Sequence, residues 1–379
     1  MKRRKRRFVL AGRSDSLYNI NKSVTKNLKE DSMKQIQVAI WGFGAMGSGI
    51  AKVLLTKKGV EITGVCDIHP DRVGKSIYDL LGVERGDRND VKVIGDIDAA
   101  LTPKPDLCIL ATDSFTKKAY PKICHLIEKG VNVISTAEEM SYPRAQNPEL
   151  ADKMDALAKG AGVSVLGTGI NPGLMMDLLA ICLSGCMTDV EHVLCKRVNS
   201  LSPFGPAVME EQGVGLTVEQ FEEGCKNGSL AGHVGFAESV GMIGEALGFK
   251  IDRFEQQMKP IITTVDRKSP YGFAKAGDVA GVNMTGQGYI GDKVMIDMIH
   301  PQQIEPEMEG TYTGDYITLT GTPNVNMQIK PEVNGGIGTI AMCVNMIPHV
   351  LNATPGLKTM IDLPVPHAIM GDMRNYLNK

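Results

Sequence analysis

A glycine-rich turn near the start of the chain constrains the fold more than any other segment. Residues 36–41 form an apolar, β-branched run typical of a buried strand, and they lead straight into Gly42-Phe43-Gly44-Ala45-Met46-Gly47. A helical pattern follows at residues 47–55, and a second strand pattern at residues 60–66 ends at Asp67. A strand, a GxGxxG turn, a helix and an acidic residue about 20 positions further on make up the fingerprint of a dinucleotide-binding fold.

Each glycine of this turn has its own physical reason. Gly42 permits the tight turn, Gly44 lets a pyrophosphate approach the backbone, and Gly47 allows the helix to pack closely on the strand. The free N–H groups and partial positive charge at the helix N-terminus favour phosphate. We therefore expect the dinucleotide to be bound by Gly42, Phe43, Gly44, Ala45, Met46 and Gly47.

Asp67 is the candidate contact for the adenosine ribose. Its carboxylate would accept hydrogen bonds from the ribose diol and repel a 2′-phosphate, which favours NAD. Arg72 and Lys75 follow closely and can pair with that phosphate, so the predicted cofactor is NAD or NADP. In an alternative interpretation, Asp67 is a turn residue ahead of Pro70.

The alternation of strands and helices predicts an α/β fold. It continues to residue 166, which indicates a Rossmann-type parallel-sheet domain at residues 33–166. We expect a second, α+β domain for substrate binding and oligomerisation at residues 167–337. A C-terminal segment, 338–379, is expected to begin with a helix and to return to the Rossmann domain.

The second domain has a different pattern. Segments 190–199, 289–300 and 316–320 alternate between apolar and polar residues, which is typical of an antiparallel sheet with one free face. Glycine and proline are dense at 202–215 and 270–288, where we expect loops.

The charge is distributed unevenly along the chain. Residues 1–32 carry a net charge of +7 and the remainder −9. We expect residues 1–32 to be a disordered basic extension, with an arm for an anionic partner as the alternative. The acidic body argues against a nucleic-acid partner, and no apolar stretch reaches the ~20 residues that would span a membrane. Eight scattered cysteines without a CxxC pair indicate reduced thiols and a cytoplasmic protein.

The ends of three predicted strands offer groups for chemistry, because ligands of open α/β sheets lie beyond the carboxyl ends of the strands. Ala111 and Thr112 are expected to lie against the nicotinamide side of the cofactor. Glu138 and Glu139 place two carboxylates at the next strand end, and adjacent residues point apart, so at most one faces the cofactor. That carboxylate would be a general base for oxidation at a C–N carbon, unless the pair is a solvated charged loop.

The third strand end is Gly167-Thr168-Gly169-Ile170-Asn171-Pro172-Gly173. Pro172 is placed like the first residue of a helix over 173–183. That helix start is either a seat for a substrate carboxylate, with Asn171 and Gly173 as contacts, or only a cap. Candidate substrate contacts at this strand end are Thr168, Asn171, Pro172 and Gly173.

His233 and Glu238 lie at the start of an apolar helix pattern further along. His233 is a candidate proton carrier or substrate contact, or it makes a structural hydrogen bond. Glu238 would neutralise a substrate ammonium or form an ion pair. Cys182 and Cys186 are four residues apart but have no partner ligands, so no metal site is predicted.

Several of these segments together resemble the dihydrodipicolinate-reductase-like family of amino-acid and amine dehydrogenases. The resemblance rests on the glycine turn, on residues 135–143 and 167–173, and on segments 232–239 and 355–360. Within the family, residues 197–206 and 212–215 resemble the members that act on 2,4-diaminopentanoate. The likeness runs from about Met33 to the C-terminus.

The resemblance implies NAD(P)-dependent oxidative deamination of 2,4-diaminopentanoate at C4, as in ornithine degradation, giving 2-amino-4-oxopentanoate and ammonia. It also implies a cytoplasmic homodimer, and a catalytic glutamate at Glu138 or Glu139. The chain has no His-His pair and no Asn-Lys in place of Glu138-Glu139, which argues against dihydrodipicolinate reduction and homoserine oxidation. The remaining alternatives are a relative acting on another diamino or keto acid and a non-catalytic NAD(P)-sensing protein.

Overall fold

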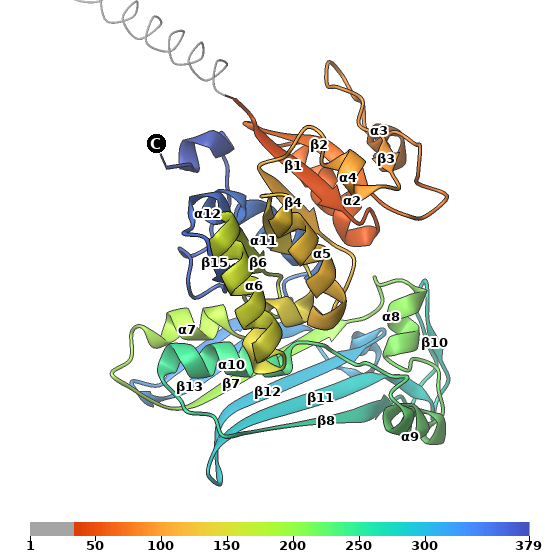
Figure 1. The fold of residues 1–379 in the computed structure, drawn as a ribbon. Helices are drawn as coiled ribbons and strands as arrows, with labels where there is room; N and C mark the ends of the chain where they lie inside the picture. The colour runs from red at the N-terminus through yellow and green to blue at the C-terminus, as the bar shows by residue number, and fades with distance from the viewer. Residues whose placement is uncertain (1–33, 379) are drawn as a thin grey trace, which may run out of the picture.

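The computed structural model describes residues 34–378, which form two large sheets, one above the other in the view of Figure 1, and a small two-stranded sheet, with helices between and around the large ones. The predicted basic extension, residues 1–32, lies outside the described residues. In the part of the chain that the structure describes, no helix is long and apolar enough to cross a membrane, and no cluster of His, Cys, Asp and Glu is arranged to hold a metal ion.

The first sheet confirms the predicted Rossmann-type fold. Its seven strands are all parallel and run in the order β15-β6-β5-β4-β1-β2-β3. Their bounds are β1 (Ile36–Trp41), β2 (Val60–Cys66), β3 (Val93–Ile94), β4 (Leu107–Leu110), β5 (Asn132–Ser135), β6 (Ser164–Gly167) and β15 (Gly356–Lys358). The buried apolar runs of these strands explain why the sheet is covered on both faces.

Helices from both ends of the chain cover this sheet. One face packs against α2 (Ala45–Leu54), α11 (Gly335–Asn345) and α12 (Ile347–Asn352), and the other against α5 (Thr116–Glu128) and α6 (Pro148–Ala161). The helix expected at the start of segment 338–379 is thus two helices, and α11 lies beside α2 (Figure 1). The C-terminal segment then adds β15 next to β6.

The second sheet has six strands in the order β14-β13-β7-β12-β11-β8. It is mixed, and not antiparallel as predicted, because β7 and β12 pair in parallel. A connection running from β7 through three helices and four strands makes this parallel pairing possible. The bounds are β7 (Asp189–Ser200), β8 (Arg253–Ile262), β11 (Val279–Ile290), β12 (Lys293–Gln303), β13 (Gly314–Thr322) and β14 (Val325–Ile329).

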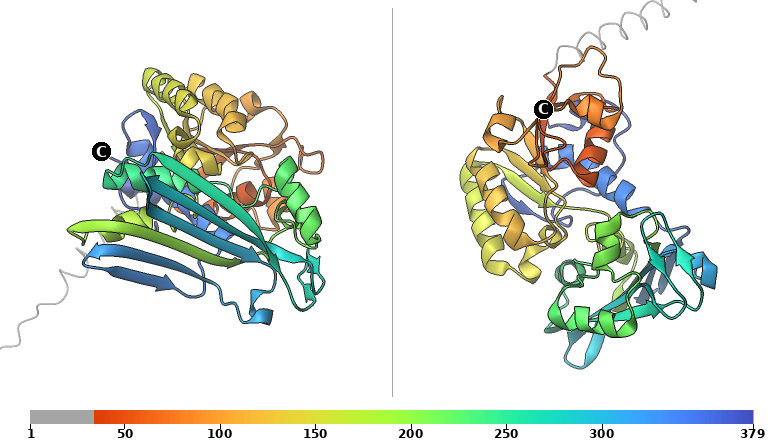
Figure 2. Two further views of the ribbon diagram at one scale, coloured as in Figure 1. Left: turned by 90° about the horizontal axis from the view of Figure 1, so that it is seen from below. Right: turned by 90° about the vertical axis from the view of Figure 1, so that its right-hand side faces the viewer.

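One face of this sheet packs against α7 (Leu178–Ser184), α9 (Val218–Asn227) and α10 (Phe236–Leu247). In the described chain the opposite face carries no helix, as the view from below shows (Figure 2). The helical layer therefore lies between the second sheet and the Rossmann domain.

The loops predicted at 202–215 and 270–288 are wrong in part. The first contains α8 (Pro206–Glu211), and the second contains most of β11. The glycines of β11 provide room for packing and do not mark turns: a Cβ on Gly286 would lie 2.7 Å from the Phe236 ring, and one on Gly288 would lie 2.7 Å from Val240. Small residues in this strand let α10 lie close to the sheet.

The remaining elements are short and connect the larger ones. They are α3 (Ile77–Leu81), α4 (Ile97–Ala100), β9 (Arg267–Lys268), β10 (Phe273–Ala274) and the 3₁₀ turns η1 (Glu138–Ser141), η2 (Pro143–Ala145), η3 (Pro306–Glu309) and η4 (Met373–Tyr376). Among them, η1 and η2 matter most, because they carry the predicted catalytic carboxylates.

Candidate active site

A cavity of about 410 Å³ lies where the carboxyl ends of β4, β5 and β6 meet the second sheet. Its Rossmann wall includes Ala111, Thr112, Thr136 and Glu138. The opposite wall comes from β7 and β12, and α2 and α11 contribute Met46 and Thr339. The position agrees with the rule that ligands of open α/β sheets bind beyond the strand carboxyl ends.

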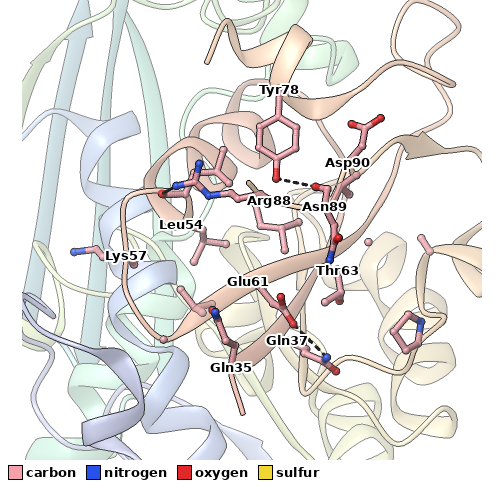
Figure 3. Close-up of a pocket in the computed structure, with 18 of the residues that line it drawn as sticks. Gln35, Gln37, Leu54, Lys57, Glu61, Thr63, Tyr78, Arg88, Asn89 and Asp90 are labelled. Carbon is pink, nitrogen blue, oxygen red and sulfur yellow. Dashed lines mark hydrogen bonds between the residues drawn. The ribbon is translucent and has the colours of Figure 1, made fainter. Parts of the chain in front are cut away.

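A larger, open cavity of about 1370 Å³ lies elsewhere, along β1 and β2 and the loop before β3 (Figure 3). Gln37 Nε2 donates to Glu61 Oε1 at 3.3 Å there, and the Tyr78 hydroxyl donates to the Asn89 carbonyl at 3.1 Å. None of the candidate catalytic or binding residues lines it. The smaller cavity is therefore the candidate active site.

The glycine turn has the close contacts that a dinucleotide site requires. Gly42 has φ +97°, and a Cβ there would lie 2.4 Å from the Ala111 carbonyl oxygen. A Cβ on Gly47 would lie 1.8 Å from the Gly42 carbonyl oxygen, whereas the space beside Gly44 is open. Because no side chain caps the N-terminus of α2, its N–H groups are available to phosphate. These features fit a bound dinucleotide.

Asp67 is fixed at the end of β2. Its carboxylate accepts hydrogen bonds from the backbone N–H groups of Phe43 at 2.6 Å and His69 at 2.7 Å, and from Arg72 Nη1 at 3.0 Å. Burial alone would raise the pKa of Asp67, but these three donors outweigh it and hold the pKa below its usual value. Arg72, predicted as a phosphate contact, is thus paired with Asp67, and Lys75 is exposed.

The two adjacent glutamates have different surroundings. Glu139 is buried, and its Oε2 accepts hydrogen bonds from the backbone N–H of Thr116 at 2.7 Å and from Asn147 Nδ2 at 3.3 Å. Glu138 lines the cavity. Burial raises the pKa of Glu138 to about 7, against hydrogen bonds from its own backbone and Ser114, and the charges of Glu211 and Glu139 add to the rise. We therefore assign Glu138, and not Glu139, as the candidate base.

The helix start predicted at residues 172–173, which was either a carboxylate seat or a cap, is wrong. The helix begins at Leu178, not at Gly173, with Asp177 as its N-cap. The Gly173 N–H donates to Asp177 Oδ2 at 2.8 Å, so this amide already has an anionic partner within the chain. Pro172 follows a cis peptide bond and is not a first helical residue. The buried Asp177 carboxylate thus accepts the hydrogen bonds that a bound substrate carboxylate would accept in the alternative suggested by the sequence.

Other residues of this strand end do reach the cavity. Thr168, Asn171 and Pro172 all line it. Asn171 Nδ2 lies 3.0 Å from His233 Nε2, which therefore acts as the acceptor. Burial, with the charge of Arg197, lowers the pKa of His233 to about 3. His233 lines the cavity, and its lowered pKa favours a neutral ring and argues against a proton carrier. The contact with Asn171 is the structural hydrogen bond of the alternative interpretation.

Glu238, a predicted substrate contact, lies beneath the surface. Its side chain is fully buried in α10 and is not among the described residues that line the cavity. Its Oε1 accepts a hydrogen bond from Gln146 Nε2 at 2.8 Å. It therefore cannot contact a substrate ammonium in this arrangement.

Sequence reasoning missed the far wall of the cavity. Four polar side chains from β7 and β12 form it, and all four are less than one-tenth exposed: Arg197, Asn199, His300 and Gln302. Arg197 Nη1 donates to Asp315 Oδ1 at 2.5 Å, and its Nη2 donates to the Val333 carbonyl. His300 Nε2 lies 2.8 Å from Asn199 Oδ1, and the Gln302 Nε2 has no partner among the described residues.

A periodic signal for this wall exists in the sequence. Along β7, Val193, Cys195, Arg197 and Asn199 lie on the helix-facing side, and the buried residues change from apolar to polar along the strand. Ile296, Met298, His300 and Gln302 show the same change along β12. The parallel register places Gln302 beside Asn199. Polar residues at buried positions of a strand indicate a site more reliably than polar residues in loops.

The fold, the glycine turn and the cavity together define an NAD(P)-dependent dehydrogenase of the Rossmann type, and the comparisons with known proteins specify it further. Residues 174–379 match the family model of the 2,4-diaminopentanoate dehydrogenase C-terminal domain. The chain is 59% identical over 349 residues to the 2,4-diaminopentanoate dehydrogenase of Acetoanaerobium sticklandii, covering 92% of this chain and 98% of that protein.

Two amine dehydrogenases are also similar. The structure of the Mycobacterium smegmatis amine dehydrogenase matches with a TM-score of 0.78 and 28% identity, covering 89% of this chain and 98% of that one. The amine dehydrogenase of Streptomyces virginiae is 23% identical over 356 residues, or 88% of this chain and 98% of that protein. This chain belongs to the 2,4-diaminopentanoate dehydrogenase family, which confirms the predicted family, and its cofactor is NAD or NADP.

Proposed function

We propose that the protein oxidises 2,4-diaminopentanoate at C4, converting the substrate, NAD(P)⁺ and water into 2-amino-4-oxopentanoate, ammonium, NAD(P)H and a proton. The observation that carries this proposal is the polarity of the cavity, which has the Glu138 carboxyl in one wall and the Arg197 guanidinium in the other. A substrate with a carboxylate at one end and an ammonium at C4 has the complementary charges.

Arg197 is the proposed anchor for the substrate carboxylate, because the Gly173 N–H already donates to Asp177. It is permanently charged, and its pairing with Asp315 fixes the guanidinium on β7. Asn199 and Gln302 add polar groups beside it. Holding the carboxylate at this wall keeps C2 near β7 and β12 and presents C4 to Glu138, which gives a physical reason for oxidation at C4 and not at C2.

Glu138 is the proposed general base. An ammonium group cannot release hydride from its carbon, so the base must first accept a proton from the C4 ammonium. With a pKa of about 7, Glu138 is largely ionised at mildly alkaline pH and still basic enough for this transfer. The bound nicotinamide supplies the hydride acceptor.

The same carboxyl group serves the hydrolytic half of the reaction. After hydride leaves C4, the substrate carries a C=N bond that water must attack. Once Glu138 has released its first proton to solvent, it takes a proton from that water as the C–O bond forms and returns it to nitrogen. Glu138 then takes the hydroxyl proton as the C4=O bond forms, the C–N bond breaks and ammonia leaves. Ser114 and Thr136 lie at the neighbouring strand ends and line the same wall.

The resident cofactor would be held by the glycine turn and by Asp67, with Ala111, Thr112 and Met46 on the side of the cavity. We propose a preference for NAD, because the ionised Asp67 would repel a 2′-phosphate although Arg72 neutralises part of its charge.

The helix-free face of the second sheet supports a homodimer in which two copies pack through it (Figure 2). The eight free cysteines support a cytoplasmic location.

A direct assay tests the proposed reaction. The purified protein is incubated with NAD⁺ or NADP⁺ and, separately, 2,4-diaminopentanoate, ornithine, meso-diaminopimelate and homoserine. We expect reduced cofactor, ammonia and 2-amino-4-oxopentanoate only with the first. Faster turnover of another substrate would replace the proposed one, and cofactor binding without any turnover would favour an NAD(P)-sensing protein.

A further inference from the structure

Glu238 is a buried carboxyl group that the proposed mechanism does not use. It lies in α10 with no exposed surface, and its one side-chain hydrogen-bond partner in the described part of the chain is Gln146, which donates to Oε1 at 2.8 Å. Its Oε2 is buried and has no partner among residues 34–378. A buried ionised carboxylate with one neutral donor is costly, whereas a protonated carboxyl in the same place is tolerated.

The segment that Glu238 contacts is the one that carries Glu138. Gln146 ends the stretch formed by η1 and η2, and α10 packs against both turns. Tyr142 in the same stretch donates its hydroxyl hydrogen bond to Glu245, one more residue of α10. A Cβ on Gly241, between the two glutamates of α10, would lie 2.7 Å from the Tyr142 ring. The helix is therefore fitted closely to this segment.

Negative charge already accumulates there. Glu139 is held in place by Thr116 and Asn147, which are neutral donors, and Glu138 must ionise to act as a base. No ion pair described among residues 34–378 involves either of them or Glu238. Ionised Glu238 would add a third uncompensated charge.

The other groups near α10 do not neutralise it. On η1 these are Glu138 and Glu139, and around η2 they are Tyr142 and Arg144, the latter paired with Asp152 at 3.1 Å. Asp177, which precedes α7, accepts from Ser239 at 2.9 Å and is itself acidic. Glu245 is on the same helix, and α7 and β11 contain no Asp, Glu, Lys, Arg or His.

We propose that Glu238 is a positioning residue for Glu138: it ties the catalytic segment to α10 through Gln146, and the charge that it gains on ionising makes Glu138 hold its own proton more tightly. The inference rests on the proposed role of Glu138. Burial raises the pKa of Glu238 to about 7, with the Gln146 hydrogen bond opposing and the charges of Glu139 and Glu138 adding to the rise. Two interacting carboxyl groups of similar proton affinity titrate as a pair.

The test compares Glu238→Gln with Glu245→Gln as the matched control. Gln at 238 preserves the shape and an acceptor for Gln146 but cannot ionise. Gln at 245 likewise replaces a carboxylate by an amide, but at the exposed residue that accepts the hydrogen bond from Tyr142. We expect the acid limb of the kcat/KM–pH profile to lie about 0.5–1 pH unit lower in Glu238→Gln than in the wild type. The limb should also fit the ionisation of one group in the variant, in place of two coupled groups. Glu245→Gln should match the wild type. A Glu238→Gln profile that coincides with the wild type would overturn the proposal.

An infrared measurement reads Glu238 without turnover. The difference between wild type and Glu238→Gln should contain a protonated-carboxyl band at pH 6 that disappears near pH 7, and Glu138→Gln should move that midpoint to lower pH. A missing band, or a midpoint indifferent to Glu138→Gln, would refute the coupling. If Glu138→Gln retains turnover, the base assignment fails, yet the infrared result still decides whether Glu238 holds a proton. If Glu238→Gln does not fold, the spectra of the wild type and of Glu138→Gln decide instead. The protonated-carboxyl band should disappear between pH 6 and 8 in the wild type, and its midpoint should lie at lower pH in Glu138→Gln.

Discussion

Replacing Glu138 by Gln removes the proposed base with almost no change in shape. In the structure this side chain lines the cavity and has a pKa of about 7, so roughly nine-tenths of it is ionised at pH 8 and one-tenth at pH 6. The wild-type kcat/KM should therefore rise about tenfold between these pH values, if no other group titrates. General base catalysis contributes about 10²–10⁴ in rate, so we expect kcat of Glu138→Gln to fall by that factor and its acid limb to disappear.

Glu139→Gln is the matched control because it makes the same chemical change one residue away. Its carboxylate is used by Thr116 and Asn147 and does not line the cavity. The assay is the initial rate of cofactor reduction with 2,4-diaminopentanoate, with NAD(P)⁺ binding measured separately by calorimetry. Cofactor affinity should be unchanged in Glu138→Gln. A Glu138→Gln enzyme within tenfold of the wild type, or an equal loss in both variants, would refute the assignment of the base.

Four further outcomes are expected. Glu139→Gln should lower the free energy of unfolding by about 1–3 kcal/mol in chemical denaturation, because a charged acceptor is lost; an unchanged midpoint would contradict this role. Arg197→Met should raise KM for 2,4-diaminopentanoate about 10–100-fold but alter turnover of an amine without a carboxylate far less; equal effects would exclude the anchor. Asp67→Ser should shift the ratio of kcat/KM values toward NADP about tenfold or more, and a constant ratio would argue against the ribose contact. The pKa of buried Glu238 is raised from 4.5 to about 7, so its contribution to stability is present below about pH 4.5 and is lost as the pH rises through 7. Between pH 4 and pH 8, the free energy of unfolding of Glu238→Gln should therefore rise by about 3 kcal/mol relative to that of the wild type. Curves of unfolding free energy against pH that run parallel for the two proteins would contradict this.

The Rossmann domain was predictable because its signals are local. The sequence predicts strands at residues 36–41 and 60–66 with the bounds that the structure has. Each is a short apolar run bounded by turn residues, and the glycine turn lies between the first strand and a helix. Short strands such as β3 and short helices such as α3 carry too few residues for a periodic pattern, and they were not predicted.

The second domain was harder because its decisive contacts are distant in sequence. Arg197 and His300 reach one cavity only because β7 and β12 pair in parallel across about a hundred residues. The glycines of β11 were taken as loop residues, although they accommodate α10. Nothing in a local pattern distinguishes a glycine that turns the chain from one that admits a neighbouring helix.

The choice between Glu138 and Glu139 also depends on distant contacts. The two have the same side chain and adjacent positions, and Glu139 is distinguished by the donors that its carboxylate accepts from, the backbone N–H of Thr116 and Nδ2 of Asn147. Likewise Asp177 converts the expected anion seat at Gly173 into an internal cap. Sequence reasoning found the loops that carry the chemistry, whereas the packing of the chain decides which group in each loop faces the cavity.

A crystal structure of the ternary complex with oxidised cofactor and 2-amino-4-oxopentanoate tests the account most directly. The account predicts the product carboxylate on the Arg197 guanidinium and the C4 oxygen within about 3 Å of the Glu138 carboxyl, on the nicotinamide side of the cavity. A product bound with its carboxylate away from Arg197, or a Glu138 side chain turned from the nicotinamide with another group in its place, would contradict it.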